Sequence, residues 1–180
     1  MRVPQRFRPT SMHDFDDDDF ADEADDSVES QVWQLLALIN PGDEDTALRQ
    51  FAAWRDVQAE SGDGADPVET MGEVVDWTSG FRADDAPTLV QALNELVARW
   101  NLAIDWDGDP DDEEFFDERD LADLLATAYD RLLERGYTVW IYESAAAGYA
   151  GWITLSRDAE PLRELATALG INLRLASEAG

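Results

Sequence analysis

The chain has 180 residues, 44% of them hydrophobic, so it can bury one sizeable core and still carry a helical extension. Its 41 acidic residues stand against 13 basic ones, giving a net charge of −28, and it contains no cysteine. This charge argues against binding to nucleic acid or anionic membranes, because a protein that binds them needs a basic surface. The lack of cysteine excludes disulfides, thiolate catalysis and iron–sulfur clusters.

Residues 1–28 are predicted to be a disordered acidic tail. Ten acids and no base lie between residues 14 and 29, and such a run buries too little apolar surface to offset ordering entropy. No apolar stretch follows the N-terminal arginines, so we expect no signal peptide, and no apolar run approaches a membrane span. We therefore expect a cytoplasmic protein. The tail either solubilises the chain or folds, through Phe15 and Phe20, onto a basic partner.

Four amphipathic helices are predicted over residues 29–101. The first spans residues 30–40 and stops at Pro41-Gly42, and the second spans residues 43–60. The third begins at residues 66–67 and ends before a loop at residues 79–81. The fourth spans residues 85–100, with leucines at three- and four-residue steps. These segments should pack as one helical layer.

From residue 102 the pattern is β-α-β-β-α-β. Strands are predicted at 102–106, 137–144, 152–156 and 171–176, and helices from Leu121 to Gly136 and from Asp158 to Gly170. This order indicates a ferredoxin-like antiparallel sheet over residues 102–180. The fold class is therefore α+β, with the N-terminal helical layer packed on that sheet as one compact unit. We expect both crossover helices on one face and the N-terminal helices over part of the other, which carries Trp140 and Tyr142.

The loop at residues 105–120 holds ten carboxylates and one base, Arg119. Trp106, Phe115 and Phe116 lie among these carboxylates. Large aromatic side chains surrounded by carboxylates are suited to contact with a basic protein surface. The leading hypothesis is a non-enzymatic acidic binding protein, of the immunity or inhibitor type, that engages a basic partner through this loop. The alternatives are that the charge serves only solubility, or that Phe115 and Phe116 fold back onto the core. The candidate partner-binding residues are Trp106, Asp107, Asp109, Asp111, Asp112, Glu113, Glu114, Phe115, Phe116 and Glu118.

A calcium-responsive domain is the second hypothesis for the same loop. Its candidate ligands, at positions 1, 3, 5, 7 and 12 of a calcium-loop frame, are Asp107, Asp109, Asp111, Glu113 and Glu118. The glycine that this frame needs at position 6 is replaced by Asp112, and a predicted strand precedes the loop where a helix is expected.

No catalytic residue is predicted, and an unidentified enzyme ranks lowest among the hypotheses. The single histidine, His13, lies in the predicted tail, and Ser144 and Ser156 have no histidine to activate them. The aromatic residues of the hairpin, Trp140, Tyr142, Tyr149 and Trp152, are better explained as core than as a base-stacking surface, because few arginines lie near them in sequence.

The segments IDWDGDPDD, GYTVWIYES, GWITLSRD and LGINLRLA together resemble an uncharacterised bacterial family, a domain of unknown function, over roughly residues 30–176. The resemblance implies no activity, cofactor or catalytic residue.

Overall fold

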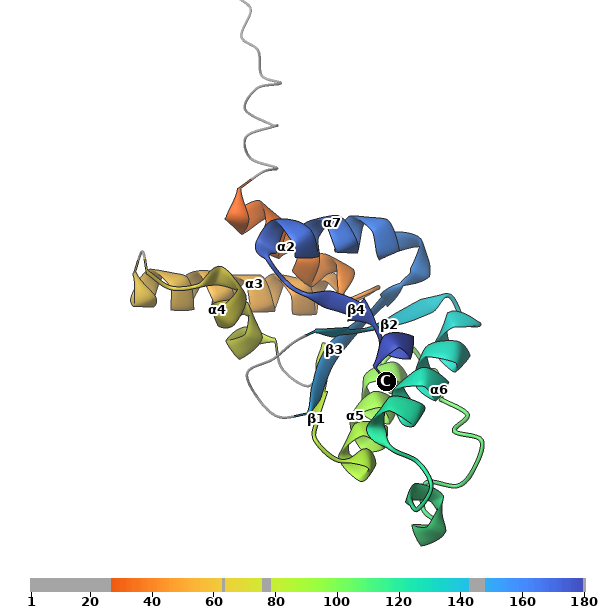
Figure 1. Cartoon of the computed structure of the whole chain (residues 1–180). Coiled ribbons are helices and arrows are strands. Elements are labelled where there is room, and N and C mark those ends of the chain that lie inside the picture. The colour runs from red at the N-terminus through yellow and green to blue at the C-terminus, as the bar shows by residue number, and fades with distance from the viewer. Residues whose placement is uncertain (1–26, 63, 76–78, 143–147, 180) are drawn as a thin grey trace, which may run out of the picture.

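The computed structural model describes residues 27–62, 64–75, 79–142 and 148–179 (Figure 1). The tail predicted over residues 1–28 lies almost wholly outside these ranges. None of the described helices is both long and apolar enough to cross a membrane. In chain order the elements are α2 (Val28–Leu38), α3 (Glu44–Ser61), α4 (Pro67–Val74), β1 (Gly80–Ala83), α5 (Ala86–Ala98), η1 (Glu113–Phe116), α6 (Leu121–Leu133), β2 (Tyr137–Tyr142), β3 (Tyr149–Leu155), η2 (Ser156–Asp158), α7 (Ala159–Leu169), β4 (Leu173–Leu175) and η3 (Ala176–Glu178).

Aspartates begin four of the helices. Asp43, Asp66, Asp85 and Asp120 each accept a hydrogen bond from a backbone N–H two or three residues further on. The carboxylate satisfies an otherwise unpaired amide and complements the positive end of the helix dipole. All six predicted helices are confirmed to within a few residues. Signals of this kind lie within the segment itself, so the sequence is enough to locate these helices.

The four strands form one antiparallel sheet in the order β1-β3-β2-β4. β2 and β3 make the predicted hairpin, with Trp140 opposite Trp152 and Ile141 opposite Gly151. Strand β1 pairs with the other edge of β3, and β4 with the other edge of β2. The sheet therefore has short edge strands on both sides of a longer hairpin.

The predicted strand at residues 102–106 is wrong. This segment is irregular, and the first strand is β1, which the sequence had suggested was a loop. Ile104 and Trp106 alternate with exposed neighbours because they pack in one cluster with α5 and α6, not because the segment joins the sheet. From β1 onward the order is β-α-α-β-β-α-β, so the ferredoxin-like order is not confirmed.

Helices cover both faces of the sheet (Figure 1). Val139, Ile141 and Ile153 pack with α5 and α6 on one face, whereas Trp140 and Trp152 pack with α2, α3, α4 and α7 on the other. The expectation that both crossover helices share one face is therefore wrong, because α6 and α7 lie on opposite faces. As expected, N-terminal helices cover the tryptophan face, namely α2, α3 and α4. The fourth predicted N-terminal helix, α5, packs on the opposite face, so the prediction that all four form one helical layer is wrong.

A buried polar network joins the N-terminal helices to the sheet. The hydroxyl of Ser79, next to β1, donates to Asn40 Oδ1 at 2.5 Å and accepts from Gln50 Nε2 at 2.7 Å. Asn40 in turn donates to Gln50 Oε1 and accepts from Arg99. Burial lowers the pKa of Arg99 to about 10, so its guanidinium stays charged at neutral pH. The network links α2, α3, β1 and α5.

Candidate functional site

The acidic loop, residues 105–120, connects α5 to α6 and carries η1 at its tip (Figure 1). Three aspartates shape its turns with their own side chains. Asp105, Asp109 and Asp112 each accept a hydrogen bond from the backbone N–H two residues later, at 3.0–3.1 Å. Such bonds favour turns over helix or strand. The aspartates therefore serve the loop's conformation as well as its charge.

Two large aromatics attach the acidic loop to the core. Trp106 is 3% exposed, and its indole nitrogen donates to Asn94 Oδ1 on α5 at 3.0 Å. Phe115 is 8% exposed and packs edge-to-face on the half-buried Phe116, with 4.9 Å between ring centroids. These three residues were candidate partner anchors, yet the structure turns Trp106 and Phe115 inward. The surface left for a partner consists of carboxylates and the exposed part of Phe116.

Two arginines hold the loop backbone through hydrogen bonds to its carbonyl groups. Arg119 donates to the carbonyl oxygens of Trp106 and Asp107, and its guanidinium lies 4.3 Å from the Phe115 ring centroid. Arg131 on α6 pairs with the Asp107 carboxylate and also donates to the Asp105 carbonyl. The hydrogen bond and charge of Asp107 raise the pKa of Arg131. Both arginines therefore stabilise the conformation that displays the remaining acids.

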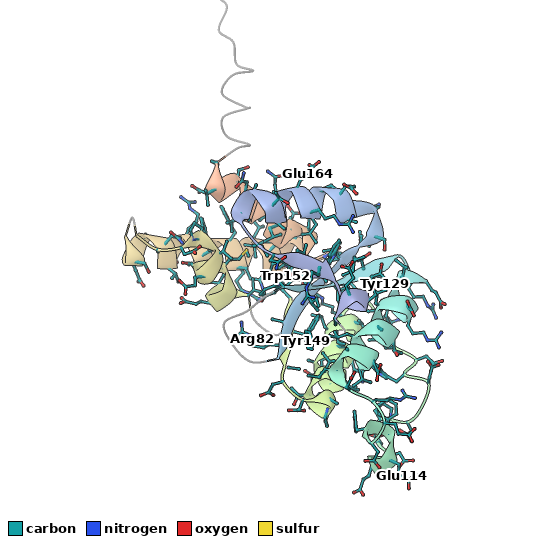
Figure 2. All side chains as sticks on the ribbon, viewed as in Figure 1. Arg82, Glu114, Tyr129, Tyr149, Trp152 and Glu164 are labelled. Carbon is teal, nitrogen blue, oxygen red and sulfur yellow. The ribbon has the colours of Figure 1, made fainter. Side chains whose placement is uncertain are left out.

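The predicted partner-binding acids all lie on the outside of the loop. Asp107, Asp109, Asp111, Asp112, Glu113, Glu114 and Glu118 are exposed, and Figure 2 shows Glu114 at the far tip of the molecule. Between them lies a shallow hollow of about 270 Å³. Asp109, Asp112, Glu114 and Glu118 surround it, with Phe115 and Arg119 also lining it. The loop thus presents a dense negative surface that is hollowed between these four carboxylates.

The structure does not gather the predicted calcium ligands. Among the described residues, which include all five candidates, no three histidine or acidic side chains are placed to hold a metal ion together. Asp107 is paired with Arg131, and Asp109 uses its carboxylate to form a local turn. The calcium hypothesis therefore stays a prediction without a formed ligand set.

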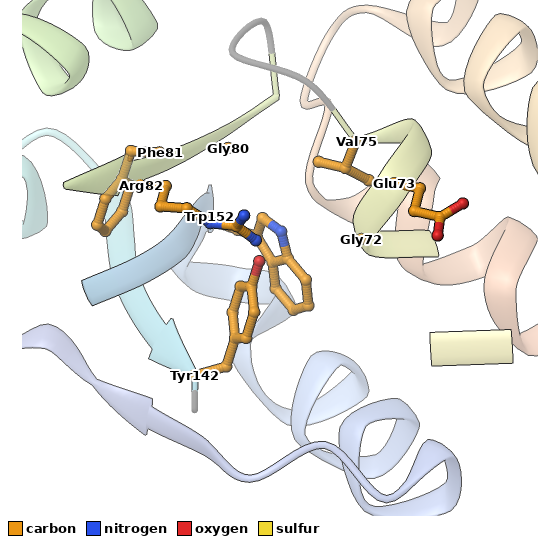
Figure 3. A pocket seen from close by; sticks show the side chains of 8 residues that line it. All are labelled: Gly72, Glu73, Val75, Gly80, Phe81, Arg82, Tyr142 and Trp152. Carbon is orange, nitrogen blue, oxygen red and sulfur yellow. The ribbon is translucent and has the colours of Figure 1, made fainter. Parts of the chain in front are cut away.

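A second candidate site, missed in the sequence, is a pocket of about 230 Å³ between α4 and the tryptophan face of the sheet (Figure 3). Val75 and Glu73 line one side, and Arg82, Tyr142 and Trp152 line the other. The Tyr142 and Trp152 rings lie against each other, with centroids 4.5 Å apart. No short motif marks these residues, since four separate segments supply them. The density of aromatics in the hairpin was the only signal.

A model of a domain of unknown function, DUF6630, matches residues 31–176. The chain belongs to this family. The matched span includes both the acidic loop and the pocket, so both features lie within the DUF6630 domain. No curated protein and no solved structure gives a significant match.

Proposed function

We propose that this DUF6630 protein is a non-enzymatic binding protein that engages a basic protein, in the manner of an immunity or inhibitor protein, through the acidic loop. The observation that carries the proposal is the orientation of the loop's side chains. Buried Trp106 and Phe115 and two arginines hold the backbone, while the carboxylates stay exposed. A loop selected only for solubility needs charge but does not need this internal support.

Electrostatics favour such a partner. The net charge of −28 attracts basic proteins over distances of about a Debye length, roughly 10 Å at 0.1 M salt. Complementary charge mainly accelerates association and rejects partners of the wrong sign. We therefore propose that the loop selects its partner by charge and that affinity falls with salt. The absence of cysteine fits a reducing compartment, and we propose a cytoplasmic location.

The hollow in the loop gives this surface a specific point of contact. Four carboxylates, from Asp109, Asp112, Glu114 and Glu118, line a space of about 270 Å³. We infer that it receives an arginine or lysine side chain of the partner, because carboxylates form charge-assisted hydrogen bonds with guanidinium and ammonium groups. The positive charge of Arg119, which also lines the hollow, is already directed to backbone carbonyls.

The test compares two variants of equal net charge. The loop variant replaces Asp109, Asp112, Glu114 and Glu118 by Asn or Gln. The control variant neutralises four exposed helical acids outside the loop, Asp56, Glu60, Glu69 and Glu164. Each protein is used to capture partners from its native lysate at low and moderate salt, and any basic protein retained is then purified and titrated by calorimetry.

We expect the wild type and the control variant to bind one basic protein with similar affinity, and the loop variant to bind it at least about ten-fold more weakly. A ten-fold loss corresponds to about 1.4 kcal/mol, close to the lower limit of about 1.5 kcal/mol for one close charge pair across an interface. Equal losses in both variants would show that only net charge matters. Either that result or the absence of any common basic partner would refute the proposal.

A further inference from the structure

The pocket between α4 and the sheet is formed by residues outside the acidic loop, so its function is separate from partner binding. Its geometry follows from the strand register. Arg82 on β1 lies opposite Ala150 on β3, and Ala150 lies opposite Tyr142 on β2. Paired residues point to the same face of a sheet. Because Ala150 is small, it leaves room for the long side chains of Arg82 and Tyr142 to meet. Figure 3 shows the Arg82 guanidinium beside the Tyr142 hydroxyl.

The next residue pair on the same face of the sheet, Gly80 and Trp152, provides the open space of the pocket. Gly80 on β1 lies opposite Trp152, and a Cβ added at Gly80 would lie 3.1 Å from Trp152 Cδ1 and 3.4 Å from Val75 Cγ1. The lack of a side chain at Gly80 therefore keeps the pocket open between the sheet and α4. The resulting walls are apolar on the Val75 and Trp152 sides and polar at the Arg82 end.

The polar end of the pocket is rich in hydrogen-bond donors. The Arg82 side chain is exposed and forms no ion pair with any carboxylate of the described residues, although the chain has 41 acids. Burial raises the pKa of Tyr142, and the nearby Arg82 offsets this only in part. The phenol is therefore protonated at neutral pH and able to donate a hydrogen bond next to the guanidinium.

Among the described residues that line the pocket, the other charged group is Glu73, on the α4 side. Figure 3 shows its carboxylate directed away from Tyr142 and Trp152. A ligand with one negative group would meet donors at the Arg82 end, whereas a second negative group near α4 would meet Glu73. Charge within the pocket thus favours a single anionic group.

We propose that this pocket binds a small monocarboxylate whose apolar body is about the size of one aromatic ring. The carboxylate lies against the Arg82 guanidinium and the Tyr142 hydroxyl, and the apolar body lies against Val75 and Trp152. An arginine fork matches a planar carboxylate with two parallel hydrogen bonds, which an amide or a spherical ion does not reproduce. A volume of about 230 Å³ accommodates one ring and its acid group.

The test titrates the full-length protein with phenylacetate, phenylacetamide, 1,4-phenylenediacetate and inorganic phosphate. Binding is followed by NMR at the assigned indole N–H of Trp152, which lines the pocket. The variant Arg82→Gln removes the charge at an exposed position, and Arg157→Gln is the matched control at another exposed arginine. The variant Tyr142→Phe removes only the hydroxyl. A melting curve of each variant verifies that it is folded.

We expect saturable, millimolar or tighter binding of phenylacetate, with weaker binding of the amide, the diacid and phosphate. Arg82→Gln should weaken phenylacetate binding about ten-fold, Tyr142→Phe roughly two- to ten-fold, and Arg157→Gln not at all. Equal binding of the acid and the amide, or an unchanged affinity in Arg82→Gln, would overturn the proposal. Equal or tighter binding of phosphate would show a general anion site and overturn the monocarboxylate assignment. The absence of any saturable shift at Trp152 would also overturn it.

Discussion

Gly151 is the position at which the strand order is most directly tested. It lies in β3 between Phe81 of β1 and Ile141 of β2. A Cβ added there would lie 1.8 Å from the carbonyl oxygen of Trp140 and 2.6 Å from Cζ of Phe81, well under the 3.0 Å limit for real Cβ contacts. Because the oxygen belongs to the neighbouring backbone, no change of rotamer relieves the overlap. The variant Gly151→Ala must therefore separate β3 from β2.

Overpacking a core usually costs about 1–3 kcal/mol, and this clash with backbone belongs at or above the upper end. We expect Gly151→Ala to lower the free energy of unfolding by about 3 kcal/mol or more. For a domain of this size that corresponds to a fall in Tm of roughly 6–12 °C. Urea and thermal unfolding followed by circular dichroism measure both quantities.

The control is Gly72→Ala in α4, where an added Cβ meets nothing within 4 Å. It also adds one methyl group, but we expect it to stabilise the helix by about 0.5–1 kcal/mol. A Gly151→Ala protein as stable as the wild type would refute the register of β1, β3 and β2. It would also remove the pairing that places Arg82 beside Tyr142.

Three further predictions concern the polar network, a helix cap and the acidic loop. Ser79→Ala removes the buried hydroxyl that Gln50 and Asn40 share, so unfolding experiments should show a loss of about 1–3 kcal/mol, whereas exposed Ser177→Ala should show almost none. Hydrogen bonds from the Thr88 backbone N–H and hydroxyl lower the pKa of Asp85, so its carboxylate stabilises the fold above its ordinary pKa of 3.8 and loses this effect as the pH falls below it. The Tm deficit of Asp85→Asn should therefore be present at pH 7 and shrink at pH 3, and a deficit independent of pH would contradict this. Equal millimolar Ca²⁺ and Mg²⁺ should shift Tm equally, because no three described acids gather; a larger Ca²⁺ shift that Asp109→Asn with Glu118→Gln abolishes would instead support the calcium hypothesis.

The helices could be predicted from the sequence because their signals are local. An aspartate at the first position and apolar residues at three- and four-residue steps lie within one segment, as in α5 after Asp85. Strand β1 could not be found in this way. It has four residues, and its stability depends on pairing with residues 149–152, almost 70 positions away in the chain. A pattern confined to residues 80–83 does not contain that information.

Residues 102–106 show the opposite error. Their alternation of apolar and polar residues is typical of a strand, yet alternation reports only which side chains are buried. Ile104 and Trp106 are buried in the cluster that includes α5 and α6, and Trp106 donates a hydrogen bond to Asn94. The same limit applied to the acidic loop. Its position and charge could be read directly, and the return of Phe115 to the core was one of the alternatives. The burial of Trp106 depends on how the flanking helices α5 and α6 pack against each other, which the sequence pattern does not state.

The mistaken assignment of residues 80–83 also concealed the pocket. In a strand, successive side chains point to opposite faces, so β1 sends Phe81 and Ala83 into the core shared with α5 and leaves Gly80 and Arg82 on the tryptophan face. If residues 80–83 are interpreted as a loop, the directions of their side chains are undefined. Nothing then distinguishes Arg82 from the other arginines, of which the chain has thirteen in total. Once β1 is paired with β3, the register alone brings Arg82 next to Tyr142 and places Gly80 opposite Trp152. The donor-rich end and the open space of the pocket are thus consequences of one short strand. A variant that disrupts β1 pairing should therefore abolish ligand binding in the pocket even where the acidic loop still binds its partner.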